Sequence, residues 1–244
     1  MEIRFDGKRA LVTGAGKGIG RDIAVALHKY GAETVAISRS QEDLDLLKSE
    51  CPGIQTVNLD LAEWSNVKTV VGGLGYFDLL VNSAGVTRVG PFLDVSEDDI
   101  DYVFNVNYKC LFNVCQTVAK GMVERGQGGA IVNISSVAST IGLADHAVYC
   151  STKGAVDSLT QVMALELGVK KIRVNCVNPT VVMTDMGRKV WSDPAKANPV
   201  LARIPLGHFA EIEDVRNAVM FLLSEKASMI NGSCMPIEGG LLCN

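Results

Sequence analysis

The sequence predicts one α/β domain, a doubly wound parallel sheet of about seven strands with helices on both faces. Its 244 residues are enough for a single large domain. Hydrophobic residues make up 48% of the chain and charged residues 20%, as in ordinary globular proteins. Short β-rich runs alternate with helical patterns from one end to the other, without a repeat or a low-complexity linker. We therefore expect residues 1–244 to form one unit.

The alternation begins with a β-rich run at 9–14, followed by a helical pattern at 19–31 that stops at Gly31. Further strands are predicted at 34–38, 54–59, 77–85, 129–136, 172–179 and 233–240. Further helices are predicted at 41–50 and near 62–71, 97–123, 147–168 and 211–224. The stretch 184–205 contains Gly, Asp, Asn and Pro, which predicts a long irregular segment. Such segments are often lids.

Chemically unusual residues follow the ends of the predicted strands. In an open parallel sheet, ligands bind in the crevice at the carboxyl ends of the strands. One unusual residue stands at or just after each of the first six strands: Gly14, Ser38, Asp60, Asn82, Ser136 and Pro179. Together they predict a single binding site along that edge of the sheet.

A glycine-rich turn, TGAGKGIG at 13–20, connects the first strand to the first helix. Gly14, Gly18 and Gly20 have the spacing G-x-x-x-G-x-G, which differs from the G-x-G-x-x-G fingerprint. The physical basis is shared, because glycines let the backbone approach a pyrophosphate and a helix N-terminus offers free N–H groups. An ordinary strand-to-helix turn would need no ligand, but the position after the first strand favours dinucleotide binding.

The end of the second strand indicates which dinucleotide binds. A ribose 2′-hydroxyl is usually bound by a carboxylate about 20 residues beyond the glycines, whereas a 2′-phosphate is accommodated by cations. This chain has Ser38 and Arg39 there, and Lys17 lies in the glycine turn. Either cation alone is typical of a solvated surface charge. Together they predict NADP(H).

Tyr149 and Lys153 lie four residues apart on one face of the predicted helix 147–168. An ammonium beside a phenol favours the phenolate, which helps a tyrosine to protonate a carbonyl oxygen or to deprotonate an alcohol. Ser136, at the end of the fifth strand, could hydrogen-bond the same oxygen. Taken alone, the pair is more typical of an ordinary helix surface.

Asn107 lies within the apolar stripe of the predicted helix 97–123. Asparagine is a poor residue for a helix interior, and a buried amide needs hydrogen-bond partners. We expect either that a neighbouring backbone satisfies the amide or that the amide holds a functional group or a water in place.

Composition excludes several function classes. A formal net charge of -4 and the lack of a basic run argue against nucleic acid as a partner. The N-terminus has no signal-peptide core, and no apolar run is long enough for a transmembrane segment, so we expect a cytoplasmic protein. The 7 cysteines include no C-x-x-C pair, and no histidine has ligand spacing to them. We therefore expect no metal site or disulfide framework, and buried thiols in a reducing compartment.

These motifs, with NSAG at 82–85, YCSTK at 149–153 and NPTVVMT at 178–184, resemble the short-chain dehydrogenase/reductase family over the whole chain. The family implies a Rossmann-like fold, with Tyr149 as general acid/base and Lys153 both activating it and binding the nicotinamide ribose. It also implies that Ser136 orients the carbonyl and Asn107 holds a proton-relay water. The cofactor contacts it implies are those already named together with Ile19, Asp60, Leu61, Asn82, Ala84, Gly85, Val182 and Thr184.

Further stretches, including ECPGI and IRVNCVNPTVVMTDMG, resemble a branch of this family that reduces small ketoses and α-dicarbonyls. Ser83 and Thr180 depart from the pattern of the whole family, although the resemblance to the branch includes Thr180. Val137 departs from the branch itself, where a polar residue is expected. We expect His146 and Trp191 to contact the substrate beside Ser136, Val137 and Tyr149, unless His146 caps a helix and Trp191 packs the lid. The rival functions are reduction of bulkier ketones or 3-oxoacyl thioesters, and a silent dinucleotide-binding protein. The resemblance also implies a homotetramer.

Overall fold

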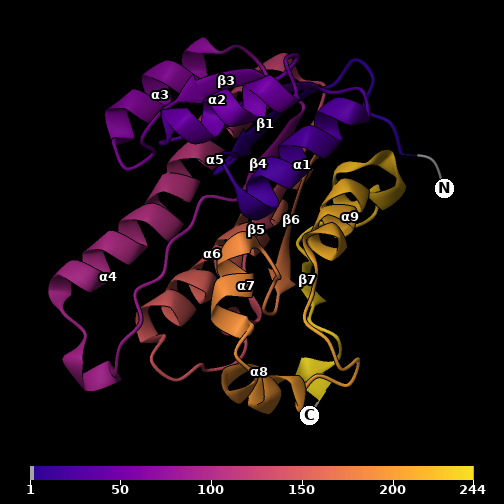
Figure 1. The fold of residues 1–244 in the computed structure, drawn as a ribbon. Coiled ribbons are helices and arrows are strands. Elements are labelled where there is room, and N and C mark those ends of the chain that lie inside the picture. The colour runs from indigo at the N-terminus through magenta and orange to yellow at the C-terminus, as the bar shows by residue number, and fades with distance from the viewer. Residues whose placement is uncertain (1–2, 244) are drawn as a thin grey trace.

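A single parallel sheet forms the centre of the computed structural model, which describes residues 3–243 (Figure 1). Its seven strands have the order β3-β2-β1-β4-β5-β6-β7. They are β1 (Arg9–Thr13), β2 (Glu33–Ser38), β3 (Gln55–Asn58), β4 (Leu79–Asn82), β5 (Gly129–Ile134), β6 (Ile172–Pro179) and β7 (Cys234–Ile237). The doubly wound parallel sheet predicted from the sequence is confirmed. Residues 1, 2 and 244 of the predicted domain lie outside the described residues.

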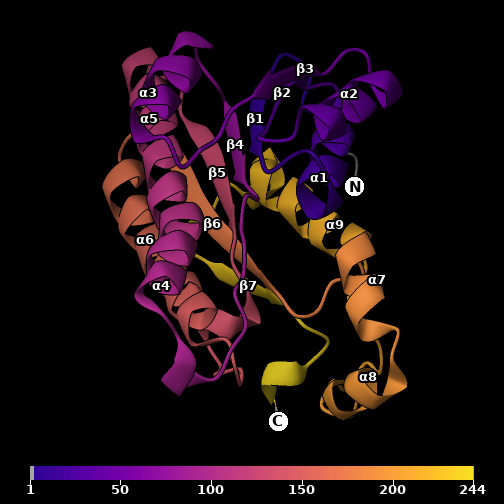
Figure 2. The same cartoon turned by 60° about the vertical axis from the view of Figure 1, so that its left-hand side comes forward.

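Helices cover both faces of this sheet (Figure 2). The helices are α1 (Gly18–Lys29), α2 (Gln41–Glu50), α3 (Trp64–Gly73), α4 (Glu97–Phe104), α5 (Cys110–Arg125), α6 (Ala147–Gly168), α7 (Asp185–Trp191), α8 (Pro194–Leu201) and α9 (Ile212–Leu223). Apolar residues of α1, α2 and α9 pack on one face, and those of α3, α5 and α6 pack on the other. Side chains alternate along a strand, so neighbours such as Leu11 and Val12 enter opposite cores.

Two predictions of secondary structure were wrong. The stretch 184–205 is not irregular, because it forms α7 and α8. Thr184 accepts a hydrogen bond from the Gly187 N–H at 3.1 Å, and Asp193 caps α8 in the same way. Helices this short carry too few apolar repeats for a periodicity to be recognised, although Thr184, Asp193 and Pro194 are typical start signals.

The predicted helix 97–123 is also not continuous. A π-helical turn, Asn105–Lys109, separates α4 from α5. The turn inserts one residue into the helical repeat, so the face that each helix presents shifts at this point. Asn107 lies in this turn and is buried.

The strand register brings polar residues together at the carboxyl edge of the sheet. Thr13 pairs with Asn82, and Asn82 pairs with Asn133. The Asn82 amide donates to the Asn133 side-chain oxygen at 2.9 Å, and the Thr13 hydroxyl accepts from the Ser83 N–H at 3.2 Å. These bonds fix the strand ends from which the site is built. Within residues 3–243, no helix has the length and apolar character needed to cross a bilayer.

Candidate active site

A cavity of about 870 Å³ runs along the carboxyl ends of the strands. Every site residue predicted from the sequence lines it, except Asn82 and Asn107, which are buried behind its wall. The cavity walls also include residues that the sequence analysis did not single out, such as Asp43, Thr87, Met186 and Arg203. The prediction of one continuous site at this edge is therefore supported by the arrangement of the side chains.

The glycine turn forms one end of the cavity and cannot accept side chains. A Cβ on Gly14 would lie 2.6 Å from the Ala84 nitrogen, and one on Gly20 would lie 2.4 Å from the Gly14 oxygen. Gly14 and Gly18 also have positive φ angles, 64° and 58°, which favour glycine. The N-cap residue of α1, Lys17, makes no side-chain cap bond. The free N–H groups of this helix start thus face a narrow cradle that fits a pyrophosphate.

A cationic region lies beside this cradle. Lys17 and Arg39 are exposed and line the cavity together with Ser38. Within the described residues, neither cation makes a hydrogen bond or an ion pair, so both charges are available to an anion. Asp43 also lines this region, and a Cβ on Gly16 would lie 2.6 Å from the Ser38 hydroxyl and 2.9 Å from the Asp43 Cβ. Ser38 and Asp43 therefore close the pocket around Gly16, so the two cations lie beside one carboxylate.

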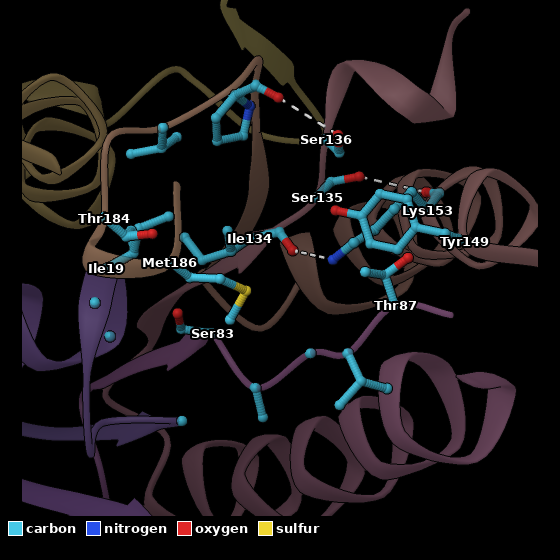
Figure 3. Close-up of a pocket in the computed structure, with 18 of the residues that line it drawn as sticks. Ile19, Ser83, Thr87, Ile134, Ser135, Ser136, Tyr149, Lys153, Thr184 and Met186 are labelled. Atoms are coloured by element: carbon cyan, nitrogen blue, oxygen red, sulfur yellow. Dashed lines mark hydrogen bonds between the residues drawn. The ribbon is translucent and has the colours of Figure 1, made fainter. Parts of the chain in front are cut away.

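Tyr149 and Lys153 come from the first turns of α6 and face the middle of the cavity (Figure 3). Lys153 is 5% exposed, and its Nζ donates a 2.9 Å hydrogen bond to the Ile134 carbonyl at the end of β5. The same Nζ lies 5.5 Å from the centre of the Tyr149 ring. The Tyr149 hydroxyl makes no hydrogen bond to any residue from 3 to 243, so its proton is available to a ligand.

Ser136 is held at the end of β5, opposite Tyr149. Its hydroxyl accepts from the Ala138 N–H at 3.1 Å and lies 3.4 Å from the Pro179 carbonyl. Asn178 donates to the Ser136 carbonyl at 3.2 Å and to the Asp157 carboxylate at 2.8 Å. Asn178 and Asp157 thereby fix the Ser136 backbone. Neither residue is predicted as part of the site from the sequence, although the motif NPTVVMT contains Asn178.

Asn107 connects two segments of the site and does not line the cavity. Its side-chain oxygen accepts from the Val86 N–H at 2.8 Å, and its nitrogen donates to the Val86 carbonyl at 2.9 Å and to the Thr152 hydroxyl at 3.1 Å. A neighbouring backbone therefore satisfies this amide, as one of the two alternatives predicted. The side chain ties the wall segment after β4 to α6, close to Lys153.

The cavity wall beyond Ser136 contains an apolar cluster. Val137 belongs to a buried cluster with Phe209 and Leu241, against which Trp191 packs. The Trp191 and Phe209 rings lie 5.5 Å apart. His146 is the N-cap residue of α6 but makes no side-chain cap bond, and its ring lies 6.3 Å from that of Tyr149 in an edge-on orientation. His146 therefore adds a polar ring next to Tyr149, and Arg203 is another polar residue that lines the cavity.

A cysteine also lines the cavity, but its environment makes it unreactive. Burial, and to a lesser degree the Asp60 carboxylate, raise the pKa of the Cys110 thiol to about 11. A thiol in this state is protonated at neutral pH and is a poor nucleophile. Cys110 is therefore a poor candidate for the reactive group of the cavity.

Comparisons with known proteins agree with this geometry. Residues 14–242 match a family model described as enoyl-(acyl carrier protein) reductase. An L-xylulose reductase from Bos taurus is 57% identical over 242 residues, 99% of each chain. A carbonyl reductase [NADPH] 2 from Sus scrofa is 50% identical over 244 residues, 100% of each chain. A solved short-chain type dehydrogenase/reductase from Mycobacterium ulcerans has a TM-score of 0.94 and 30% identity, covering 99% of this chain and 92% of that one. The chain belongs to the short-chain dehydrogenase/reductase family.

Proposed function

We propose that this protein reduces small carbonyl compounds, ketoses or α-dicarbonyls, with NADPH. One observation carries the proposal: a single cavity joins the glycine cradle and cationic region at one end to Tyr149, Lys153 and Ser136. The glycine cradle and the cationic region fit a dinucleotide. Tyr149, Lys153 and Ser136 are residues that can assist the reduction of a carbonyl. The names of the bovine and porcine relatives, a sugar reductase and an NADPH-dependent carbonyl reductase, support both parts.

The choice of NADPH over NADH rests on charge. A 2′-phosphate at the end of β2 would meet Lys17, Arg39 and the Ser38 hydroxyl, all of which line the cavity there. Asp43 opposes this attraction, but the two cations outnumber it. Each charge-assisted hydrogen bond contributes about 1.5–3 kcal/mol, so two of them outweigh one nearby carboxylate at the rim of a solvated pocket.

The chain's residues supply everything except the hydride. When bound in the glycine cradle, NADPH would be the source of the hydride for the carbonyl carbon. Ser136 would donate a hydrogen bond to the carbonyl oxygen and orient it, and Tyr149 would donate its proton to that oxygen as negative charge develops. Lys153, held by the Ile134 carbonyl, would stabilise the resulting phenolate because its ammonium lies beside the ring. Asn107 would keep the Val86 segment in place against α6.

The substrate end favours small carbonyls with limited polarity. Val137, Trp191 and the cluster around them offer contact area, and His146 offers a polar ring beside Tyr149. Diacetyl fits this combination at least as well as L-xylulose, because part of the sugar's hydroxyl surface would face the apolar side chains of Val137 and Trp191. The segment 184–205, which contains α7 and α8, would close over this end of the cavity as a lid. Trp191 both packs there and faces the cavity, so its two expected roles are compatible.

A panel of carbonyl compounds tests the proposal. We expect NADPH oxidation with diacetyl and with L-xylulose. The family model's description names an enoyl-(acyl carrier protein) reductase, so a long-chain acyl thioester, as the 2-enoyl and as the 3-oxoacyl compound, belongs in the same panel as a second candidate. Turnover of the thioester alone would overturn the substrate assignment. No turnover with any member of a wide panel would leave the alternative of a silent dinucleotide-binding protein.

The assembly is proposed to be a homotetramer in the cytoplasm. Several large apolar residues on and after α6 are exposed, Val162 at 48%, Leu165 at 80% and Val169 at 82%, which is costly for a free surface. A two-fold axis pairing α5 and α6 with a second copy would bury them, and the end of the chain, 235–244, would meet another copy. Residue 244 of that segment lies outside the described residues. Free thiols at all 7 cysteines suit a reducing compartment.

A further inference from the structure

Two cysteines and an aspartate meet on the side of β6 away from the dinucleotide cradle. Cys176 on β6 pairs in register with Cys234 on β7, so their side chains leave the sheet on the same face. Asp157 on α6 lies above them. One ligand atom from each of the three groups lies within 4.8 Å of the others. No metal site is predicted from the sequence, because the spacing of cysteines along the chain does not show that strand pairing brings these two thiols together.

The oxygens of this cluster point at the buried sulfur. The Cys176 thiol lies 3.4 Å from Asp157 Oδ1 and 3.4 Å from Asn178 Oδ1, and Cys176 is fully buried. Cys234 and Asp157 are partly exposed, which leaves a route from solvent. Two sulfurs and a carboxylate oxygen, with an amide oxygen or a water as a fourth donor, form a donor set that suits a tetrahedral thiophilic cation.

The cluster is connected to the catalytic residues through Asp157 and Asn178. Asp157 follows Lys153 by one helical turn on the same face of α6. Its Oδ2 accepts from Asn178 Nδ2 at 2.8 Å, and the same nitrogen donates to the Ser136 carbonyl and to the Ser139 hydroxyl at 2.9 Å. Asp157 Oδ1 faces the Cys176 sulfur and Oδ2 faces Asn178, so a cation that takes both oxygens, or turns the carboxylate toward the thiols, removes one of the partners that orient Asn178. The backbone of Ser136 then loses part of its support.

We propose that Asp157, Cys176 and Cys234 bind one thiophilic divalent cation, zinc or cadmium, and that binding inhibits the reductase by withdrawing Asp157 from Asn178. Binding replaces one proton on each thiol by the metal, so the cation enters as two protons leave and no redox change occurs. The inhibitory part rests on the proposed reductase function. The binding part does not.

Cadmium binding is measured first, without reference to activity. Fully reduced protein is freed of metal and titrated with Cd²⁺, and the thiolate-to-cadmium charge-transfer band in the ultraviolet is followed. We expect saturation at one ion per chain. Cys176→Ala and Cys234→Ala should each abolish the saturable band, and Asp157→Asn should weaken binding at least about tenfold. Cys243→Ser, which removes an exposed thiol elsewhere, is the matched control and should keep the band.

Thermal melting of each variant without metal shows whether it folds. If Cys176→Ala fails to fold, Cys234→Ala still tests the cadmium site, because Cys234 is partly exposed and its loss is less damaging to the core. A band that survives in Cys234→Ala, or the absence of a band in reduced wild-type protein, would overturn the site. The site would also be overturned if Cys176 and Cys234 were found as a disulfide and the protein still showed no cadmium band after that disulfide was reduced.

Zinc inhibition is measured next, relative to each protein's own metal-free rate of NADPH oxidation. We expect wild-type and Cys243→Ser rates to fall at least about tenfold at saturating Zn²⁺, and the Cys234→Ala rate to change less than twofold. Binding of cadmium without any inhibition by zinc would overturn the inhibitory part. A wild-type protein that binds cadmium but oxidises no NADPH would instead contradict the proposed function, so the two failures are distinguishable.

Discussion

The Nζ of Lys153 lies 5.5 Å from the centre of the Tyr149 ring. The ammonium is almost fully buried, and the only partner that the described residues give it by hydrogen bonding is the Ile134 carbonyl at 2.9 Å. A buried charge with a single hydrogen bond is costly unless a further group interacts with it. The nearby phenol, and a ligand in the cavity, are the groups that can do so.

Lys153→Met should therefore impair both catalysis and NADPH binding. The variant keeps the volume of the side chain, but it loses the charge beside Tyr149 and leaves the Ile134 carbonyl without its donor. We expect turnover to fall at least about a hundredfold, the lower range for loss of assisted acid catalysis, and NADPH affinity to fall as well. Steady-state rates of NADPH oxidation measure the turnover, and fluorescence titration with NADPH measures the affinity. Unchanged NADPH affinity would mean that Lys153 does not contact the cofactor.

Ser38→Asp tests the choice of cofactor. A second carboxylate beside Asp43 should repel the 2′-phosphate and accept a hydrogen bond from a 2′-hydroxyl. We expect kcat/KM with NADPH to fall at least about tenfold and that with NADH to rise. Ser40→Ala, in the same wall but at the α2 N-cap, is a control for local disruption. Equal efficiency with both cofactors in the unmutated protein would contradict the role of Lys17 and Arg39.

Gly14→Ala tests the glycine cradle. The added Cβ would lie 2.6 Å from the Ala84 nitrogen, and the φ of 64° is unfavourable for alanine. Gly7→Ala is the matched control, since Gly7 has a φ of 72° but no neighbour within 4 Å of the added Cβ. We expect Gly7→Ala to cost about 1–2 kcal/mol of stability and leave NADPH binding intact. Gly14→Ala should cost more and weaken NADPH binding. Equal losses in thermal melting for the two variants would count against a close approach at Gly14.

Asp78 should make the fold sensitive to acid. Burial opposes ionisation of Asp78, but the Arg125 side chain and the Arg9 N–H outweigh it and lower the pKa of the carboxyl. A folded-state pKa below the unfolded value of about 3.9 adds stability that is present above that value and is lost as the pH falls through the folded pKa. Asp78→Asn should lower stability at pH 7 and flatten the acid side of a pH–stability curve from urea melts. Parallel curves for the two proteins would exclude this contribution.

Much of the fold was predictable from the sequence. The order of strands and helices follows from alternating β-rich and helical patterns, and the carboxyl edge of the sheet collects Gly14, Ser38 and Ser136 because all its strands are parallel. The short helices α7 and α8 were missed because their starts depend on capping by Thr184 and Asp193 and not on an apolar period.

Relationships between distant residues were not predictable. The amide of Asn107, in the π-helical turn after α4, is satisfied by the backbone of Val86 in the segment after β4. Asn178 and Asp157 support Ser136 through hydrogen bonds that join three elements. Pairing of Cys176 with Cys234 depends on the register of β6 with β7. Spacing along one chain carries no information on such register.

Tyr149→Phe tests the central claim most directly, since it removes one hydroxyl and leaves the ring beside Lys153. Initial rates of NADPH oxidation with diacetyl are compared for wild-type and variant protein, together with NADPH affinity from fluorescence titration. The proposed mechanism predicts a fall in turnover of at least about a hundredfold with nearly unchanged NADPH affinity. Turnover retained in the variant would show that another group donates the proton and would contradict the assignment of Tyr149 as the acid.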